Sequence, residues 1–524
     1  MRTIKLAWRP EEKQERYDYD GNKVADVEQA KLVYALHAAE VSKELFVKGK
    51  FLGFKIKNLV GNVRAAAVNS ALPQPDHRLG WDHPFQELVK PAKEKELTGL
   101  CEKGTFGEPI ELPKGHKRIP VMFVNGAKDD DKGMYEKMKS RLTVMGNKMK
   151  GQVSQADAYS PVTHPTSYKI ILILHLNDPK VDFDVYDVEQ AFLSVGQEKE
   201  LYVGHPKGYV IIVDRKGRVT WRELKPGELA PKTAVPVLLA LYGSIESGRL
   251  FFKGWVKWHL DYGFNTIHYD KCYLVLSDDK GNFIKMSYHV DDGLVAHKGA
   301  KMWQRYRAAI SQRFVMKYQS LEDKKKFLGM RFHLDRKRGL VHIEQSALIM
   351  KMLMQFDMQD CSTAVQSPFL DKMPTKADIP EGKEEQLAMQ ESYDMYGAIG
   401  YLNYLQMGTR LDISCSLRVL SQFAAVFGKA HVALATHMMR WLRKTINHQI
   451  TLFGVENPQI QLFTDCSHAS NPDTRKSITA VIGKLEGNTI FWKCLYQTIV
   501  SHSSCESELM ALDKGATMGM FCGG

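Results

Sequence analysis

The sequence of 524 residues leaves room for three to four domains, at about 150 residues per domain. Hydrophobic residues make up 44% of the chain and charged residues 25%, a balance that excludes a mostly disordered protein. Lysine and arginine outnumber aspartate and glutamate, 72 against 60, and the net charge of +12 favours a polyanionic partner such as nucleic acid.

The eight cysteines lie far apart, with no CxxC pair and no Cys/His cluster at metal-binding spacing. This pattern excludes zinc fingers and zinc knuckles, and it favours a reduced intracellular protein over a disulfide framework. The sequence has no run of about 18 apolar residues, and its first residues lack the core of a signal peptide. We therefore expect a soluble protein that is not secreted and has no membrane partner.

The first half of the chain alternates between predicted helices and strands. Helices are predicted over residues 27–46 and, after a linker at 72–84, from residue 84 to a stop at Gly104. Two strands around an acidic turn follow in 117–146, and then a buried helix at 167–177 and a strand at 181–188. Short hairpin-like strands are predicted within 200–224, and a helix with an aromatic face precedes Gly263.

The second half begins with two strand pairs within residues 272–297, where DDKGN and DDG are turn signals. From Lys301 the pattern turns helical, with a Met-rich helix near 345–358 and further helices at 392–406 and 429–446. The last segment has three predicted strands, followed by a helix from residue 506. The fold class is mixed α and β in a chain of several parts.

Three aspartates are the candidates for metal chemistry. Asp187 ends an apolar strand, and Asp291 and Asp292 occupy the tight turn of a hairpin with apolar flanks. Acids on apolar strands are costly unless cations neutralise them, and polynucleotide synthesis needs two divalent cations held by carboxylates. The simpler alternative is that Asp292-Gly293 only forms a type I′ turn and that Asp187 caps the next helix.

A series of segments occurs in a fixed order along the chain. They are AYSPVTHPTS (158–167), DVEQAFLS (187–194), ALYGSIESGR (240–249), HVDDGLVAH (289–297), KKFLGMRFHLDR (325–336), YGAIGYLNYLQMGTRLDISCSLRVLSQF (396–423), HVALATHMMRWLRKTINHQI (431–450) and FTDCSHASNPDTRKSITAVIG (463–483). Over about residues 85–520, the series resembles the reverse transcriptase and the start of the ribonuclease H of copia-type long-terminal-repeat retrotransposon pol polyproteins.

The resemblance implies an α+β fold: a right-hand polymerase of fingers, palm and thumb, followed by a C-terminal partial ribonuclease H-like α/β segment. The implied divisions are an upstream helical or linker region (1–80), fingers and palm (81–335), thumb and connection helices (336–454) and a truncated ribonuclease H-like segment (455–524). The implied function is RNA-directed DNA polymerase activity, with nucleotidyl transfer from a dNTP to a primer 3′-hydroxyl.

The resemblance also implies cofactors, partners and a location. Two Mg²⁺ or Mn²⁺ ions are the implied cofactors, and the partners are an RNA template, a DNA primer, RNA–DNA hybrid and dNTPs. A cytoplasmic virus-like particle or the nucleus is the implied location. The oligomeric state stays open.

Carried over by position, the resemblance makes Asp187 and Asp291 the metal-bridging acids, with Asp292 beside them. Phe192 would stack under the incoming sugar and disfavour a ribose 2′-hydroxyl, although an aromatic at such a position is more often plain core. Leu328 and Gly329, after Phe327, would form the hairpin that grips the primer end.

Two further positions have implied substrate roles. Arg141 would lie in the fingers over the triphosphate, where guanidinium suits phosphate, but without the resemblance it is a solvated charge. Gly243 would let the backbone approach the base pair where a Cβ would clash, and the alternative is an ordinary glycine between a loop and a helix.

The C-terminal segment carries Asp465 and Glu508, which the resemblance makes two of about four ribonuclease H carboxylates. The other two would fall after Gly524, so we expect ribonuclease H activity to be lost. We also expect an exposed strand edge to make residues 455–524 the least stable part of the chain.

The sequence departs from the family pattern at three positions. His289 stands where the family has Tyr, Gly248 stands where a helix-start Pro is usual, and Lys128 is the nearest substitute for a fingers lysine. Two hypotheses follow: an active RNA-directed DNA polymerase, or a catalytically inactive, degenerate copy that keeps the fold and binds nucleic acid. A basic scaffold with coincidental motifs is a third.

Overall fold

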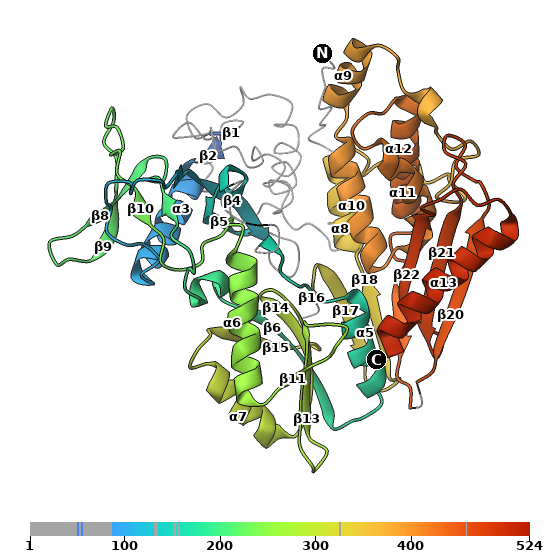
Figure 1. Ribbon diagram of the computed structural model, residues 1–524, viewed down its shortest axis with the longest axis horizontal. Helices are drawn as coiled ribbons and strands as arrows, with labels where there is room; N and C mark the ends of the chain where they lie inside the picture. The colour runs from blue at the N-terminus through green and yellow to red at the C-terminus, as the bar shows by residue number, and fades with distance from the viewer. Residues whose placement is uncertain are drawn as a thin grey trace, which may run out of the picture. The chain divides into compact units, whose positions relative to one another are not determined.

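The computed structural model describes residues 50–51, 54–55, 86–129, 135–149, 154, 158–323, 326–456 and 458–523 (Figure 1). The helix predicted at 27–46 and the linker at 72–84 lie outside these ranges. The chain forms two compact units: unit 1 comprises the described parts of residues 1–152 and 197–245, and unit 2 those of 153–196 and 246–524. The division into four segments that the sequence suggested stays a prediction.

Unit 1 is built from a helix and small sheets. Helix α3 (Gln86–Glu102) is followed by Gly104, whose φ of +68° ends it as predicted. Strands β4 (Val121–Asp129) and β5 (Tyr135–Val144) form the predicted antiparallel hairpin, and α3 packs on β5.

The remaining strands of unit 1 are short. Strands β8 (Tyr209–Val213) and β9 (Val219–Glu223) form a second hairpin. A three-stranded sheet has the order β10–β7–β3, from Val235–Pro236, Tyr202–Val203 and Arg118–Ile119, and β1 (Lys50–Phe51) pairs with β2 (Phe54–Lys55).

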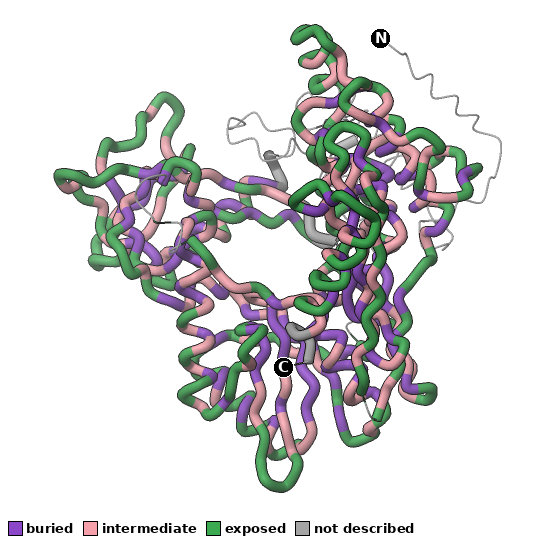
Figure 2. The backbone as a smooth tube through the Cα atoms, turned by 45° about the vertical axis from the view of Figure 1, so that its right-hand side comes forward, coloured by how far each residue is buried: buried purple, intermediate pink, exposed green. Residues whose placement is uncertain are grey.

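A six-stranded sheet forms the centre of unit 2, with the order β11–β12–β13–β14–β6–β15. Its strands are β6 (Val181–Val188), β11 (Asn265–Thr266), β12 (Tyr273–Ser277), β13 (Phe283–His289), β14 (Asp292–Lys298) and β15 (Met316–Ser320). Figure 2 shows buried residues concentrated along the central strands. All the pairs within this sheet are antiparallel.

Helices cover both faces of this sheet. The apolar residues of α5 (Pro165–His175) join Phe183, Val185 and Leu294 in one core. On the other face, α6 (Ser247–Tyr262) places Trp255 against Tyr186 at 5.7 Å between ring centroids, and α7 (Ala300–Ile310) contacts β14. The predicted aromatic face of α6 is confirmed, and Gly263 ends the helix with a φ of +112°.

The helical pattern predicted from Lys301 onwards is wrong for residues 316–344. After α7 the chain forms β15, β16 (Lys326–Phe327), β17 (Met330–Asp335) and β18 (Leu340–Glu344), and β16–β17–β18–β19 make a four-stranded sheet with β19 (Ile450–Phe453). Alternate residues of β17 and β18 are buried, which is the two-residue period of strands.

A helical group with its own apolar core follows. Its helices are α8 (Ser346–Gln355), α9 (Lys383–Ser392), α10 (Met395–Gly408), α11 (Ser414–Leu420) and α12 (Lys429–Lys444). The chain then forms the three predicted strands, β20 (Ile460–Ser467), β21 (Ile478–Leu485) and β22 (Asn488–Tyr496), in that order, and helix α13 (Ser504–Gly523), which packs on β20. No helix among the described ranges has the length and apolarity that a membrane span requires.

Candidate active site

The register of the central sheet brings the three aspartates together. Asp187, near the end of β6, is the direct partner of Asp292, the first residue of β14. Asp291 lies in the turn before β14, and its backbone carbonyl accepts a hydrogen bond from Val188 N–H at 2.8 Å. All three acids are partly buried.

The turn itself differs from the simpler alternative drawn from the sequence. His289 pairs with Asp292, so the two-residue turn consists of Val290 and Asp291, with Val290 at a φ of +57°. Asp292 and Gly293 belong to the strand and do not form the turn. Asp291 is thus at the tip, and Asp292 faces Asp187 across the sheet.

Gly293 is required by the packing beside these acids. Its partner across the strands is Tyr186, and a Cβ at position 293 would lie 2.2 Å from the tyrosine ring. Tyr186 is fully buried and stacks on Trp255. The glycine therefore lets an aromatic ring cover the strand pair that carries the acids.

The hairpin of β16 and β17 lies against the acids. Its turn is Leu328-Gly329, with φ values of +47° and +67°. The backbone N–H of Leu328 donates to Asp292 Oδ2 at 3.3 Å, and the Leu328 carbonyl accepts from the Tyr404 hydroxyl of α10 at 2.7 Å. Burial and the charge of Asp292 both raise the pKa of Tyr404.

Two residues near the acids were missed by sequence reasoning. Lys317 of β15 is the partner of Asp187 on the side opposite Asp292, and its ammonium pairs with Glu189. Tyr404 reaches Leu328 from a helix 76 residues away along the chain. Neither has a local sequence signal, because only the strand register and the helix packing bring them here.

The aspartates fit a hard divalent cation. They supply oxygen donors alone, and like charges on directly paired strand positions are unfavourable without a counter-charge. Within the described residues, no group of three or more His, Cys, Asp or Glu side chains is positioned to hold a metal ion. Mg²⁺ is commonly held by one or two carboxylates together with substrate phosphates, so the donor set suits a cation shared with a substrate.

Phe192 follows β6 in a short 3₁₀ helix, Ala191–Ser194. Its ring is partly buried and stands edge-on to Phe251 of α6, with 6.3 Å between ring centroids. One side of the Phe192 ring is therefore packed as it would be in an ordinary core residue, which was the alternative to a substrate role. A role beneath a sugar stays a prediction.

Arg141 and Gly243 both belong to unit 1. Arg141 is exposed on β5, and its guanidinium lies 5.6 Å from the centroid of the Tyr242 ring. Gly243 has a φ of +79°, and a Cβ there would lie 2.3 Å from the Val144 carbonyl oxygen. Packing of the Gly243 loop on β5 thus gives this glycine a structural reason that neither sequence interpretation contained. The predicted substrate roles of both residues stay predictions.

The structure describes the surroundings of two of the three departures from the family pattern. His289 ends β13, and burial lowers its pKa although the charge of Asp291 opposes this effect. Gly248 lies in the first turn of α6, where a Cβ would come within 3.3 Å of the Ser160 side chain. The side chain of Lys128 lies outside the described residues.

The second pair of predicted acids lies near a thiol. Asp465 lies on β20 and Glu508 on α13, and both are exposed. Burial, a hydrogen bond with Glu508 and the charge of Asp465 raise the pKa of Cys466, which lies beside both carboxylates.

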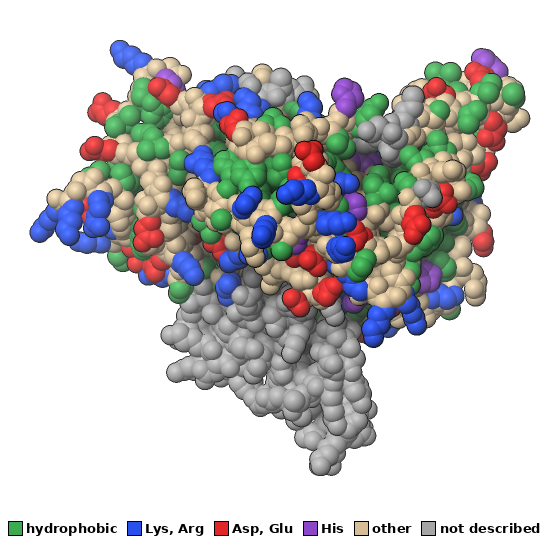
Figure 3. Space-filling model, turned by 90° about the horizontal axis from the view of Figure 1, so that it is seen from below, with side chains coloured by type: hydrophobic (Ala, Val, Ile, Leu, Met, Phe, Trp, Pro, Cys, Tyr) green, Lys and Arg blue, Asp and Glu red, His purple; other side chains and the backbone are tan. Residues whose placement is uncertain are grey.

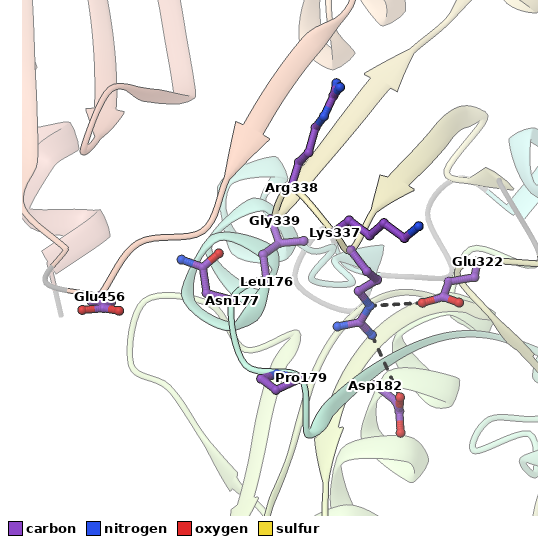
Figure 4. A pocket seen from close by; sticks show the side chains of 10 residues that line it. Leu176, Asn177, Pro179, Asp182, Glu322, Lys337, Arg338, Gly339 and Glu456 are labelled. Atoms are coloured by element: carbon purple, nitrogen blue, oxygen red, sulfur yellow. Dashed lines mark hydrogen bonds and ion pairs between the residues drawn. The ribbon is translucent and has the colours of Figure 1, made fainter.

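A polar cavity of about 600 Å³ in unit 2 is lined by other residues (Figure 4). Arg336 donates to Glu322 at 3.1 Å and lies 4.0 Å from Asp182, so its charge is already matched by acids. The remaining lining includes Lys337, Arg338 and Glu456. This mixture of basic and acidic side chains indicates no particular ligand.

Comparison with known proteins gives the class of the protein. Residues 107–371 match the family model of reverse transcriptase (RNA-dependent DNA polymerase), and the chain belongs to this family. The retrovirus-related Pol polyprotein from transposon TNT 1-94 of Nicotiana tabacum is 26% identical over 433 residues, covering 82% of this chain and 31% of that one. The Pol polyprotein from transposon RE1 of Arabidopsis thaliana is 26% identical over 403 residues, covering 76% and 25%.

These relatives confirm the particular resemblance drawn from the sequence: the chain is a reverse transcriptase region of the copia type. It spans less than a third of the length of either relative. A solved structure of apo telomerase from Candida tropicalis covers 51% of this chain and 63% of its own, with a TM-score of 0.26 and 7% identity, a likeness too slight to carry an argument.

Proposed function

We propose that this chain is an RNA-directed DNA polymerase that transfers a nucleotide from a dNTP to a primer 3′-hydroxyl by a two-metal mechanism. The observation that carries the proposal is the meeting of Asp187, Asp291 and Asp292 at one end of a paired strand. Asp187 lies more than 100 residues before the adjacent Asp291 and Asp292 in sequence, and all three lie within the family match.

In this proposal the six-stranded sheet with α5, α6 and α7 is the palm, unit 1 is the fingers, and helices α8 to α12 are the thumb and connection. Strands β20 to β22 and α13 are a ribonuclease H-like segment. Lysine and arginine are interspersed with acids over the face in Figure 3, so the net charge alone does not locate a nucleic-acid path.

Asp187 and Asp291 would hold two Mg²⁺ or Mn²⁺ ions, with Asp292 beside them. When bound, such ions activate the attacking hydroxyl and neutralise the charge of the triphosphate. The Leu328-Gly329 turn, already tied to Asp292, would position the primer end. Phe192 would lie under the incoming sugar.

Arg141 and Gly243 would have the substrate roles that the resemblance implies. Arg141 would contact the triphosphate, since a guanidinium binds phosphate through paired hydrogen bonds. Gly243 would leave room for the base pair. The proposed partners are an RNA template, a DNA primer, their hybrid and dNTPs, in a virus-like particle or the nucleus.

Primer extension on poly(rA)·oligo(dT) with Mg²⁺ or Mn²⁺ tests the proposal. The protein should incorporate dTTP, and Asp187→Asn should abolish incorporation while leaving binding of the template–primer largely intact. Asp279→Asn is the matched control, because Asp279 is exposed in another turn of the same sheet. Retained extension by Asp187→Asn would refute the site.

His289 supports the second candidate function, a catalytically inactive copy that still binds nucleic acid. It replaces the family's Tyr directly before the turn that carries Asp291. Under this alternative the wild-type protein binds the template–primer, with affinity that falls steeply as salt is added, but extends nothing. Extension by the wild-type protein decides between the two.

A further inference from the structure

One face of β22 packs against the helices α10 and α11 and the turn that follows them. The Trp492 indole N–H donates to the Gln406 carbonyl at 2.9 Å, and the Arg418 guanidinium lies 5.2 Å from the centroid of the Tyr496 ring. Alternate residues of a strand point to the same face, so Cys494, between these two aromatics, faces the same helices.

Cys415 lies on α11, the helix that packs on this face of β22, close to the position of Cys494 along the strand. It precedes Arg418 by three residues on α11, and residues three apart are neighbours on a helix surface. Arg418 itself is the residue that covers Tyr496. Cys494 is two residues from Tyr496 and Cys415 is three residues from Arg418, so the contact between Tyr496 and Arg418 brings the two cysteines near each other.

The two thiols are hydrogen-bonded to each other. This bond lowers the pKa of Cys415 to about 7 against the effect of burial, and it raises the pKa of Cys494. Because the remaining S–H stabilises the first thiolate, the pair loses its first proton more readily than an isolated buried cysteine.

We propose that Cys415 and Cys494 are a redox-active pair that a low-molecular-weight disulfide, of the glutathione type, oxidises to a disulfide between α11 and β22. The inference does not depend on polymerase activity. The two cysteines lie where α11 of the helical group packs against β22 of the C-terminal sheet, outside the aspartate site.

The oxidation proceeds by two exchanges. The Cys415 thiolate attacks one sulfur of glutathione disulfide, forming a mixed disulfide and releasing one glutathione thiolate. The Cys494 thiolate then attacks the Cys415 sulfur, forming the protein disulfide and releasing the second glutathione. The protein loses two thiols, the small disulfide becomes two thiols, and the two cysteine protons pass to the glutathione thiolates.

Other cysteines with described side chains lack these features. Burial raises the pKa of Cys101, Cys272 and Cys361, and Cys466 lies beside two carboxylates that oppose its ionisation. Thiolate is the attacking species in exchange, so these positions should react more slowly than Cys415. Cys361 is partly buried like the pair and serves as an internal control.

Peptide mapping of the full chain tests the proposal, with glutathione disulfide as the probe. Trypsin releases Cys415 in the peptide 411–418, without another cysteine, and Cys494 in 494–514, which also contains Cys505. The experiment therefore uses a Cys505→Ser protein, alkylates the remaining thiols and analyses unreduced peptides by mass spectrometry.

We expect 411–418 joined to 494–514, a species that disappears after reduction, while Cys361 is recovered alkylated. Cys415→Ser and Cys494→Ser should each abolish it. Cys415 should carry one glutathione in the Cys494→Ser protein. Cys494 should be recovered alkylated in the Cys415→Ser protein, because its pKa, which the bond to Cys415 raises in the wild-type protein, is also raised by burial. The oxidised protein should also melt at a higher temperature than the reduced one. The proposal is wrong if Cys415 and Cys494 are recovered in separate peptides, either alkylated or each carrying its own glutathione. This outcome is measured in the protein that keeps both cysteines, so it does not depend on the folding of a Cys415 or Cys494 variant.

Discussion

Unit 2 contains two groups of acids, and they differ in how the surrounding chain holds them. Asp187, Asp291 and Asp292 come from a strand and a turn, and Asp292 also accepts the Leu328 N–H. Asp465 and Glu508 come from a strand and a helix, and both lie near Cys466. The first group is partly buried and has oxygen donors only, whereas the second is exposed and includes a thiol.

The difference shows what a cation site needs beyond a motif. Hard cations such as Mg²⁺ prefer oxygen donors in a fixed arrangement, and thiols suit softer metals. Partial burial strengthens electrostatic interactions, because screening by water and salt is reduced. The first group should therefore be sensitive to every change of its acids, and the second should tolerate them.

The largest expected effect is on primer extension, which should depend on the first group of acids and not on the second. Asp291→Asn should reduce primer extension by roughly 10³-fold or more, since a lost cation ligand removes several kcal/mol of transition-state stabilisation. Asp465→Asn should leave extension within a factor of about two, because its loss touches no cation in the first group. Steady-state incorporation of labelled dTTP measures both, and equal losses in the two variants would refute the distinction.

The second-largest expected effect is on protein stability, and it comes from the packing of Gly293 against Tyr186 beside the first group of acids. Gly293→Ala should destabilise the protein by about 1–3 kcal/mol, since the added methyl group overlaps the buried Tyr186 ring. Gly400→Ala is the control: it lies in α10 with no atom within 4 Å of a built Cβ, and it should gain up to about 1 kcal/mol. Urea unfolding compares them, and wild-type stability of Gly293→Ala would contradict the close contact.

The hairpin turn gives a smaller effect. Tyr404→Phe removes the hydroxyl that holds the Leu328 carbonyl and should cost about 0.5–1.5 kcal/mol. If the turn positions a primer end, kcat should fall by up to about tenfold while the Kd for the template–primer stays unchanged. Tyr396→Phe, on the exposed side of the same helix, should change neither quantity. A loss confined to template–primer binding would contradict positioning.

Much of the local structure could be predicted because its signals are local. The aromatic residues of α6 recur at helical spacing and Gly263 ends them, and the three C-terminal strands are separated by turn residues. The helix predicted for residues 316–344 was wrong, because strands of two to six residues are too short to show a clear two-residue period in a sequence that follows a helix.

The sequence singled out the acids of the candidate site, but it could not predict what surrounds them. The motif named Asp187, Asp291 and Asp292, but which acid faces which follows from a register that no single segment specifies. Lys317 and Tyr404 reach the same place through pairing and packing of distant elements. Composition and spacing contain no information about such contacts.

The smallest expected effect is on RNA cleavage. A labelled RNA–DNA hybrid incubated with the purified protein and Mn²⁺ should stay intact, and Asp465→Asn or Glu508→Gln should change nothing. Hybrid cleavage needs about four carboxylates around two metals, and here two carboxylates lie near the Cys466 thiol, a poor ligand for hard ions. Cys466→Asp sharpens the test, because it adds a third carboxylate near the other two and should raise Mn²⁺ affinity without producing cleavage. RNA cleavage that disappears in Asp465→Asn would show that the second group is a working site and that the contrast between the two is false.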